Sequence, residues 1–230
     1  MEEASNVLFR IGPLEVTSTV TTMWAIIAVL ALVSWLATRN LKEVPVPLQT
    51  GAEMAVGALR NFFEGTLGRE HARKYLPIMG TFFIFIIVCN YSGLLPGAGH
   101  VKGFAVPTAS LSVTAGLGVA AFFTTHVIGA RERGLGPYLH SFANVKPVIL
   151  VVLMLPLNLI EQVIRPVSLA LRLYGNLSGE ETVTEQLYEI FPIGAPLIMQ
   201  VLSLLFCALQ AIVFSMLLSI YIAEALEGEE

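Results

Sequence analysis

The residues of this sequence that could do chemistry lie in a mostly apolar stretch near the C-terminus. A helix would place Glu161, Ser168, Arg172, Asn176 and Glu180 on one face, since ~100° per residue brings the first within ~20° of the arginine. At ~1.5 Å per residue, Glu161 lies ~16 Å from Arg172 along the axis and Glu180 lies ~12 Å away on the other side. A charge inside a membrane usually marks an ion pathway or a buried partner. This polar stripe therefore predicts two half-routes for an ion that meet at a fixed positive charge.

Simpler interpretations exist for each charge in the stripe. Glu161 and Arg165 are four residues apart in the favourable order, so they could simply neutralise each other. Glu180 and Glu181 could be solvated at a loop. A structural ion pair for Arg172 is disfavoured, because no acidic residue lies three or four positions away on either side.

A second polar face is expected on the last helix. Gln200, Ser203, Cys207 and Gln210 follow at spacings of three, four and three residues, which places them on one side of a helix. The alternative for this face is hydrogen bonding between helices of a bundle.

The elements that carry these residues must be membrane helices. Of the 230 residues, 55% are hydrophobic and only 13% are charged, and the mean hydropathy is +0.75. Charge-free runs lie between Glu15 and Arg39, Lys74 and Lys102, Lys102 and Arg131, and Glu189 and Glu224. Each exceeds the ~20 residues that cross a bilayer, and lipid leaves the backbone no water to bond. The predicted fold class is all-α, a polytopic helical membrane protein.

We expect one membrane domain over residues 1–230. Its predicted parts are an external N-terminal tail, three spanning helices, a surface amphipathic helix and a hairpin of two long tilted helices. The tail is 1–15, the spans are 16–38, 75–95 and 111–129, the surface helix is 47–67, and the hairpin helices are 148–190 and 191–223.

Basic residues predict the orientation of the spans. Arg39 and Lys42 follow the first span, Arg73 and Lys74 precede the second, and Arg131 follows the third. Cytoplasmic loops carry the excess of Lys and Arg, so all three spans agree on an N-terminus outside the cell. No Lys or Arg follows Arg172, so the same rule does not place the C-terminus.

Several function classes have no support in this sequence. It contains no Gly-rich phosphate loop, no metal-ligand cluster and no nucleophile motif. The net charge of −4 does not favour nucleic-acid binding, and Cys89 and Cys207 both lie in apolar runs, as small core residues do. We expect no cofactor, no metal and no nucleotide bound by this chain, and no catalytic residue.

Three motifs resemble subunit a of the membrane sector of rotary (F-type) ATP synthases. They are RPVSLALRLYGN (165–176) with Gly179-Glu180 after it, NYSGLLPG (90–97), and LQA (209–211). The resemblance covers residues 19–223, and it implies an ion-conducting stator that lies against a rotating ring of c subunits. It also implies a peripheral stalk of subunit b and a surrounding membrane, with the bacterial inner membrane as the expected location.

The same resemblance implies roles for individual residues. Arg172 matches the essential arginine, and Gln210 matches the glutamine that faces it from the last helix, so the two should approach within a side-chain contact. Asn176 and Glu180 match polar residues of the half-channels, with Glu180 on the outer route. The sequence departs from the family pattern at Asn158, where many members carry Glu; at Ser203, where a bacterial member carries His; and at Ser110 and Ser112, where Asp and Asn are frequent.

Two other functions are less consistent with this sequence than a stator. A secondary transporter using Arg172 to bind an anion would show internal repeats and discontinuous helices, and no repeat is visible here. A structural scaffold does not explain a lone arginine in an apolar helix. The expected ion is the proton; a sodium-coupled version stays open, because the ring carboxylate belongs to another chain.

Overall fold

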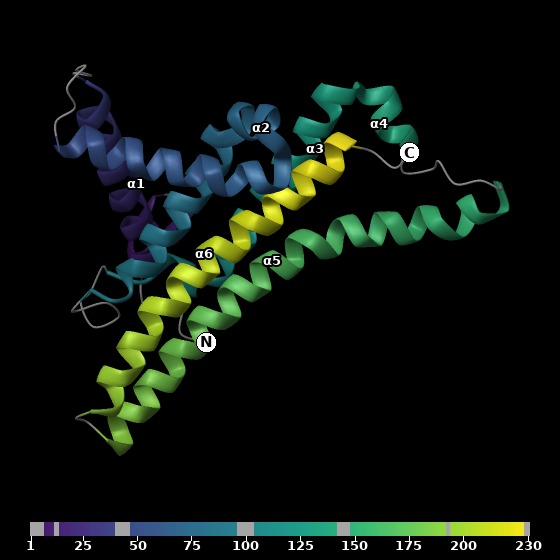
Figure 1. The fold of residues 1–230 in the computed structure, drawn as a ribbon. Helices are drawn as coiled ribbons and strands as arrows, with labels where there is room; N and C mark the ends of the chain where they lie inside the picture. The colour runs from purple at the N-terminus through teal and green to yellow at the C-terminus, as the bar shows by residue number, and fades with distance from the viewer. Residues whose placement is uncertain are drawn as a thin grey trace.

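The computed structural model describes residues 7–11, 14–39, 47–95, 104–141, 148–191 and 194–227. These ranges contain six α-helices, five of them long, which follow a short antiparallel hairpin of two strands (Figure 1). The strands are β1 (Val7–Ile11) and β2 (Leu14–Thr17), and the helices are α1 (Ser18–Thr38), α2 (Pro47–Ser92), α3 (Leu111–Arg133), α4 (Leu135–Ser141), α5 (Val148–Ile190) and α6 (Ala195–Glu227), with a short 3₁₀ turn, η2 (Pro107–Ala109), before α3.

The predicted class of a polytopic helical membrane protein is confirmed. Within the described residues, four helices are long and apolar enough to cross a membrane: Ser18–Thr38, Gln49–Ser92, Leu111–Arg133 and Leu197–Glu227. Helix α5, with 43 residues, is longer than three of these four helices, and it carries the polar stripe. The β1–β2 hairpin was not anticipated from the sequence, and it occupies part of the expected N-terminal tail.

The bounds of several elements differ from those expected. The first helix begins at Ser18, because Val16 and Thr17 belong to β2. Helix α3 continues to Arg133, and α4 forms between the expected third span (111–129) and the first hairpin helix (148–190). Helix α6 begins at Ala195, not at 191, and continues to Glu227; Gly194 precedes it with a φ of 102° that favours glycine.

Helix α2 bends sharply at Gly68. This residue has φ 71° and ψ 168°, a backbone conformation that side chains larger than hydrogen rarely adopt. The bend separates residues 47–67, the expected surface helix, from residues 69–92, which contain all but the last three residues of the expected second span (75–95). The two halves of α2 are therefore two helices that run in different directions and meet at Gly68.

The apolar core lies among α2, α3, α5 and α6. Phe63, Met79, Leu173, Phe214 and Leu218 are fully buried in one cluster. The rings of Phe82 and Phe214 stack between α2 and α6 with their centroids 6.1 Å apart. Helix α1 is peripheral, and large side chains such as Trp24 and Leu32 are exposed on it. On a membrane helix such exposed apolar side chains contact lipid, not water.

Helices α5 and α6 form a long antiparallel hairpin, and the beginning of α5 extends away from the rest of the bundle (Figure 1). Helix α3 approaches α5 most closely at Gly118. A Cβ atom built at this glycine would lie 2.7 Å from the backbone oxygen of Pro166 and 3.3 Å from the Cβ of Ala170. Only glycine permits this approach, so the contact sets where the segment before Arg172 lies.

Candidate functional site

Arg172 lies in the middle of α5 with its side chain exposed in the isolated chain. Leu169 and Leu173, on either side of it, are buried against the core, whereas Val167 and Leu171 are about half exposed. Among the residues that the structure describes, no hydrogen bond or ion pair involves the Arg172 side chain. The arginine therefore belongs to an outward, largely apolar surface and has no acidic partner within the described part of its own chain.

One helical turn along α5, Asn176 connects this surface to α6. Its side-chain nitrogen donates a hydrogen bond of 2.7 Å to the side-chain oxygen of Gln210. Gln210 is only 4% exposed, so the bond satisfies a buried polar group. Asn176 and Gln210, two of the expected residues, are thus joined across the hairpin one turn from Arg172, whereas Ser203 is buried about two turns earlier on α6.

The expected direct approach of Arg172 to Gln210 stays a prediction. In the described part of the chain no hydrogen bond joins the two, and the amide of Gln210 bonds Asn176 instead. Side chains four residues apart on a helix have Cβ atoms about 5–6 Å apart, so Arg172 is the next residue along this face from the bonded pair.

The polar face of α6 also receives hydrogen bonds from α2. Asn90 donates its side-chain amide to the carbonyl oxygen of Cys207 at 3.1 Å, and the Cys207 thiol donates to the carbonyl oxygen of Asn90 at 3.6 Å. The hydroxyl of Tyr91 donates to the carbonyl oxygen of Leu204 at 3.3 Å. Helix-to-helix bonding, the simpler interpretation, thus accounts for part of this face, although Gln200 is exposed.

The sequence places Asn90 in the NYSGLLPG motif (90–97) but does not identify its structural partners. Its side-chain oxygen is buried and has no hydrogen-bond partner among the described residues, as is also true of the Thr108 and Ser215 hydroxyls. The signal that could have singled it out is a polar amide at the end of a charge-free run. Such a group inside a membrane helix needs a partner on a neighbouring helix.

Glu161 is occupied by an ion pair. Its carboxylate lies 2.6 Å from Arg165, whose guanidinium also pairs with Glu224 on α6 and lies 5.0 Å from the centre of the Tyr221 ring. The arginine is the most enclosed of the three charges, with 20% of its side chain exposed. The simpler interpretation of Glu161 thus has direct support, and Glu224 is the partner that periodicity on α5 alone could not reveal.

Glu180, on the other side of Arg172, is half-buried. Within the described ranges its carboxylate has no ion pair, which distinguishes it from Glu161. Ser168 is also half-buried, one turn before Arg172. The stripe expected from the sequence therefore lies on one continuous helix, with a paired carboxylate at one end and an unpaired one at the other.

Three of the positions that depart from the family pattern lie where α3 begins and on α5. The hydroxyl oxygens of Ser110 and Ser112 are hydrogen-bonded at 2.8 Å where α3 begins. Asn158 is half-buried on α5. Among the described residues, no group of three or more His, Cys, Asp or Glu side chains is arranged to hold a metal ion.

Comparisons with known proteins agree with this architecture. The family model described as ATP synthase A chain matches residues 20–223. The chain is 41% identical to ATP synthase subunit a 3 of Pelobacter propionicus over 205 residues, which cover 89% of this chain and 85% of that protein. It is 37% identical over 221 residues both to ATP synthase subunit a 2 of a Bradyrhizobium species, with 96% and 94% covered, and to ATP synthase subunit a of Moorella thermoacetica, with 96% of each covered. The chain belongs to the ATP synthase A chain family.

Proposed function

We propose that this chain is the ion-conducting stator subunit of an F-type ATP synthase, with Arg172 as the fixed positive charge against which a ring of c subunits turns. One observation carries the proposal. Arg172 is exposed beside half-exposed leucine and valine side chains, and no described residue of its own chain pairs with it.

An unpaired arginine in this place needs an anion from outside the chain. A cation at the centre of a membrane helix costs at least about 2.5–3.5 kcal/mol, and a carboxylate in lipid would otherwise become neutral. When a ring carboxylate reaches Arg172, each group favours the charged form of the other. The arginine keeps its proton, so it never carries the ion itself and blocks direct passage between the two half-channels.

The other polar residues have supporting roles in this proposal. Glu180 lines the half-channel open to the outside, and Glu161 lies on the cytoplasmic half-channel. Asn176, Gln210, Ser168 and Ser203 supply polar groups and hold water near the arginine. The Asn176–Gln210 hydrogen bond supports this assignment, because it keeps both amides beside Arg172 while tying the two helices together.

The coupling ion, the partners and the membrane of this subunit follow from the same proposal. The ion is the proton, the chain has no catalytic chemistry of its own, and its partners are the c-ring, the subunit b peripheral stalk and membrane lipid. The membrane is the bacterial inner membrane, with the N-terminus outside. A ring and a soluble ATPase head should therefore co-purify with this chain, whereas a secondary transporter would purify without them.

The proposal is tested by Arg172→Ala in the complete complex, reconstituted into vesicles. ATP-driven proton pumping, followed with a pH-sensitive dye, should be abolished while all subunits still co-purify. Arg172→Lys should also fail, because a compact ammonium loses its proton more readily when buried and lacks the planar guanidinium. Substantial pumping by a fully assembled Arg172→Ala complex would show that the proposal is wrong.

A further inference from the structure

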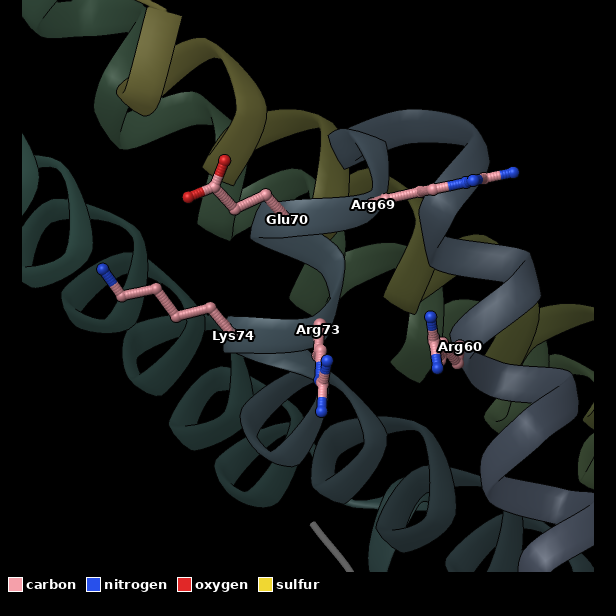
Figure 2. Close-up of a pocket in the computed structure, with 5 residues that line it drawn as sticks. All are labelled: Arg60, Arg69, Glu70, Arg73 and Lys74. Carbon is pink, nitrogen blue, oxygen red and sulfur yellow. The ribbon is translucent and has the colours of Figure 1, made fainter.

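A basic cavity of about 450 Å³ lies at the bend of α2, far along the chain from Arg172. It is lined by Arg60, Arg69, Glu70, Arg73 and Lys74 (Figure 2). The bend at Gly68 creates it, since Arg60 comes from the half before the glycine and the others come from the half after it. The cavity is open and shallow, and it has four cations against one carboxylate.

Carboxylates nearby leave part of this positive charge unbalanced. Glu64 forms a close ion pair with Arg60 at 2.7 Å. Its contact with Arg69 is looser, at 4.0 Å, and the Arg69 side chain is 91% exposed. Lys74 pairs with Glu132 on α3. Arg73 has no ion pair among the described residues. In Figure 2 the carboxylate of Glu70 points away from the guanidinium groups of Arg60 and Arg73. Arg69 and Arg73 are therefore the cations least balanced by carboxylates. Their guanidinium groups point in different directions in Figure 2, so the exposed Arg69 side chain must turn to meet an anion held at Arg73.

The residues around the cavity fit the level of lipid headgroups, where a charged segment meets an apolar one. Lys74 is the last charged residue before the charge-free run that begins at residue 75, and Ile78 in that run is exposed. Before the bend, Met54 and Phe62 are also exposed on the first half of α2. A ligand with a negative head at the arginines would thus have apolar helix surface on both sides for its acyl chains.

We propose that this cavity binds the phosphate group of an anionic phospholipid, with Arg69 and Arg73 as its principal contacts. Guanidinium groups bind phosphate oxygens with paired hydrogen bonds, and basic pockets beside membrane helices attract anionic headgroups. The lipid would hold the two halves of α2 at their bend. The proposal does not depend on ion conduction by this chain.

The test is made on the full-length chain, purified in detergent and stripped of lipid. Phosphatidylglycerol, phosphatidylcholine or inorganic phosphate is added, and bound lipid is counted by native mass spectrometry. We expect one phosphatidylglycerol to bind in preference to phosphatidylcholine, and inorganic phosphate at the same concentration should not displace it. Arg69→Gln with Arg73→Gln should weaken binding by about 30-fold, the effect of losing two basic contacts to an anionic lipid.

Two further double variants keep the test specific. Arg39→Gln with Arg131→Gln removes the same charge at the ends of α1 and α3, outside the cavity, and should leave binding unchanged. Arg69→Lys with Arg73→Lys keeps the charge and should retain most of the binding, which separates loss of the site from loss of folding.

Three outcomes would overturn the proposal. The glutamine variant could bind phosphatidylglycerol as well as the unmodified chain, or the control variant could lose as much. Inorganic phosphate could compete at equal concentration, which would assign the cavity to a soluble anion. Lastly, the purified glutamine variant could keep its lipid while the complete complex carrying the same variant loses other subunits on purification, which would identify the cavity as a protein docking surface.

Discussion

The side-chain amide of Asn176 on α5 donates a 2.7 Å hydrogen bond to the side-chain oxygen of Gln210 on α6, one helical turn from Arg172. Gln210 is buried, so this bond gives its side-chain oxygen a partner in place of water. The pair connects the two hairpin helices at the level of the arginine. Its loss should therefore affect both the packing of the hairpin and the position of Arg172.

Asn176→Ala and Gln210→Ala should each slow ATP-driven pumping, and the double variant should lose less than the sum of the two. Asn176→Ala leaves the buried Gln210 amide without its partner, which costs about 1–3 kcal/mol, and Gln210→Ala breaks the same bond but leaves an exposed Asn176 amide. The double change leaves neither amide unpaired. Initial pumping rates of reconstituted complexes measure the coupling. Thr182→Val is the control, because that hydroxyl bonds the Ser178 carbonyl of its own helix. Losses that simply add would mean that the two amides act independently.

Glu180→Gln should slow pumping with partial retention of function, and Glu161→Gln should have a smaller effect. Arg165 already neutralises Glu161 and retains Glu224 when Glu161 is removed, whereas Glu180 has no ion pair among the described residues. Water and neighbouring polar groups can share proton transfer, so neither change should match Arg172→Ala.

The sides of the two half-channels can be tested by cysteine labelling. Glu180→Cys should react with a membrane-impermeant thiol reagent added from outside, and Glu161→Cys with the same reagent added from the cytoplasm. Cys89 and Cys207 are buried, which keeps the background low. Labelling from the opposite side in either variant would reverse the assignment of the half-channels without affecting the role of Arg172.

Arg165→Gln should destabilise the chain more than Glu161→Gln or Glu224→Gln. The arginine bridges α5 and α6, and its removal leaves two carboxylates without a cation, whereas removal of either carboxylate leaves one pair intact. We expect about 1–3 kcal/mol for the arginine and less than about 1 kcal/mol for each glutamate, because both carboxylates are about half exposed. Thermal unfolding in detergent measures this order, and equal effects of all three changes would contradict the network.

Gly118→Ala should destabilise the contact between α3 and α5 by about 1–3 kcal/mol, the usual cost of overpacking. The new methyl group would lie 2.7 Å from the backbone oxygen of Pro166, and backbone atoms cannot move aside cheaply. Gly116→Ala on the same helix is the matched control, since no atom lies within 4 Å of the added carbon. The apparent melting temperature should fall for the first variant and stay equal or rise for the second. An unchanged melting temperature for Gly118→Ala would mean that the helices can separate freely at this point.

Much of this protein could be predicted from the sequence, because the controlling physics is local. Charge-free runs longer than a bilayer must be helical, and the helical period alone places Ser168, Arg172, Asn176 and Glu180 on one face of α5. The same local reasoning identified the polar face of α6 and the Glu161–Arg165 pair, whose members are four residues apart.

What only the tertiary structure decided is which faces meet. The partner of Gln210 is 34 residues away, Glu224 is 59 residues from Arg165, and Asn90 is 117 residues from Cys207. The helical period says which residues share a side, but not how two helices cross or where along their lengths they touch. Here that depends on a bend at Gly68, a close approach at Gly118 and the turn at Gly194. Each of these sets the relative position of whole helices, and no pattern within a single helix records that position.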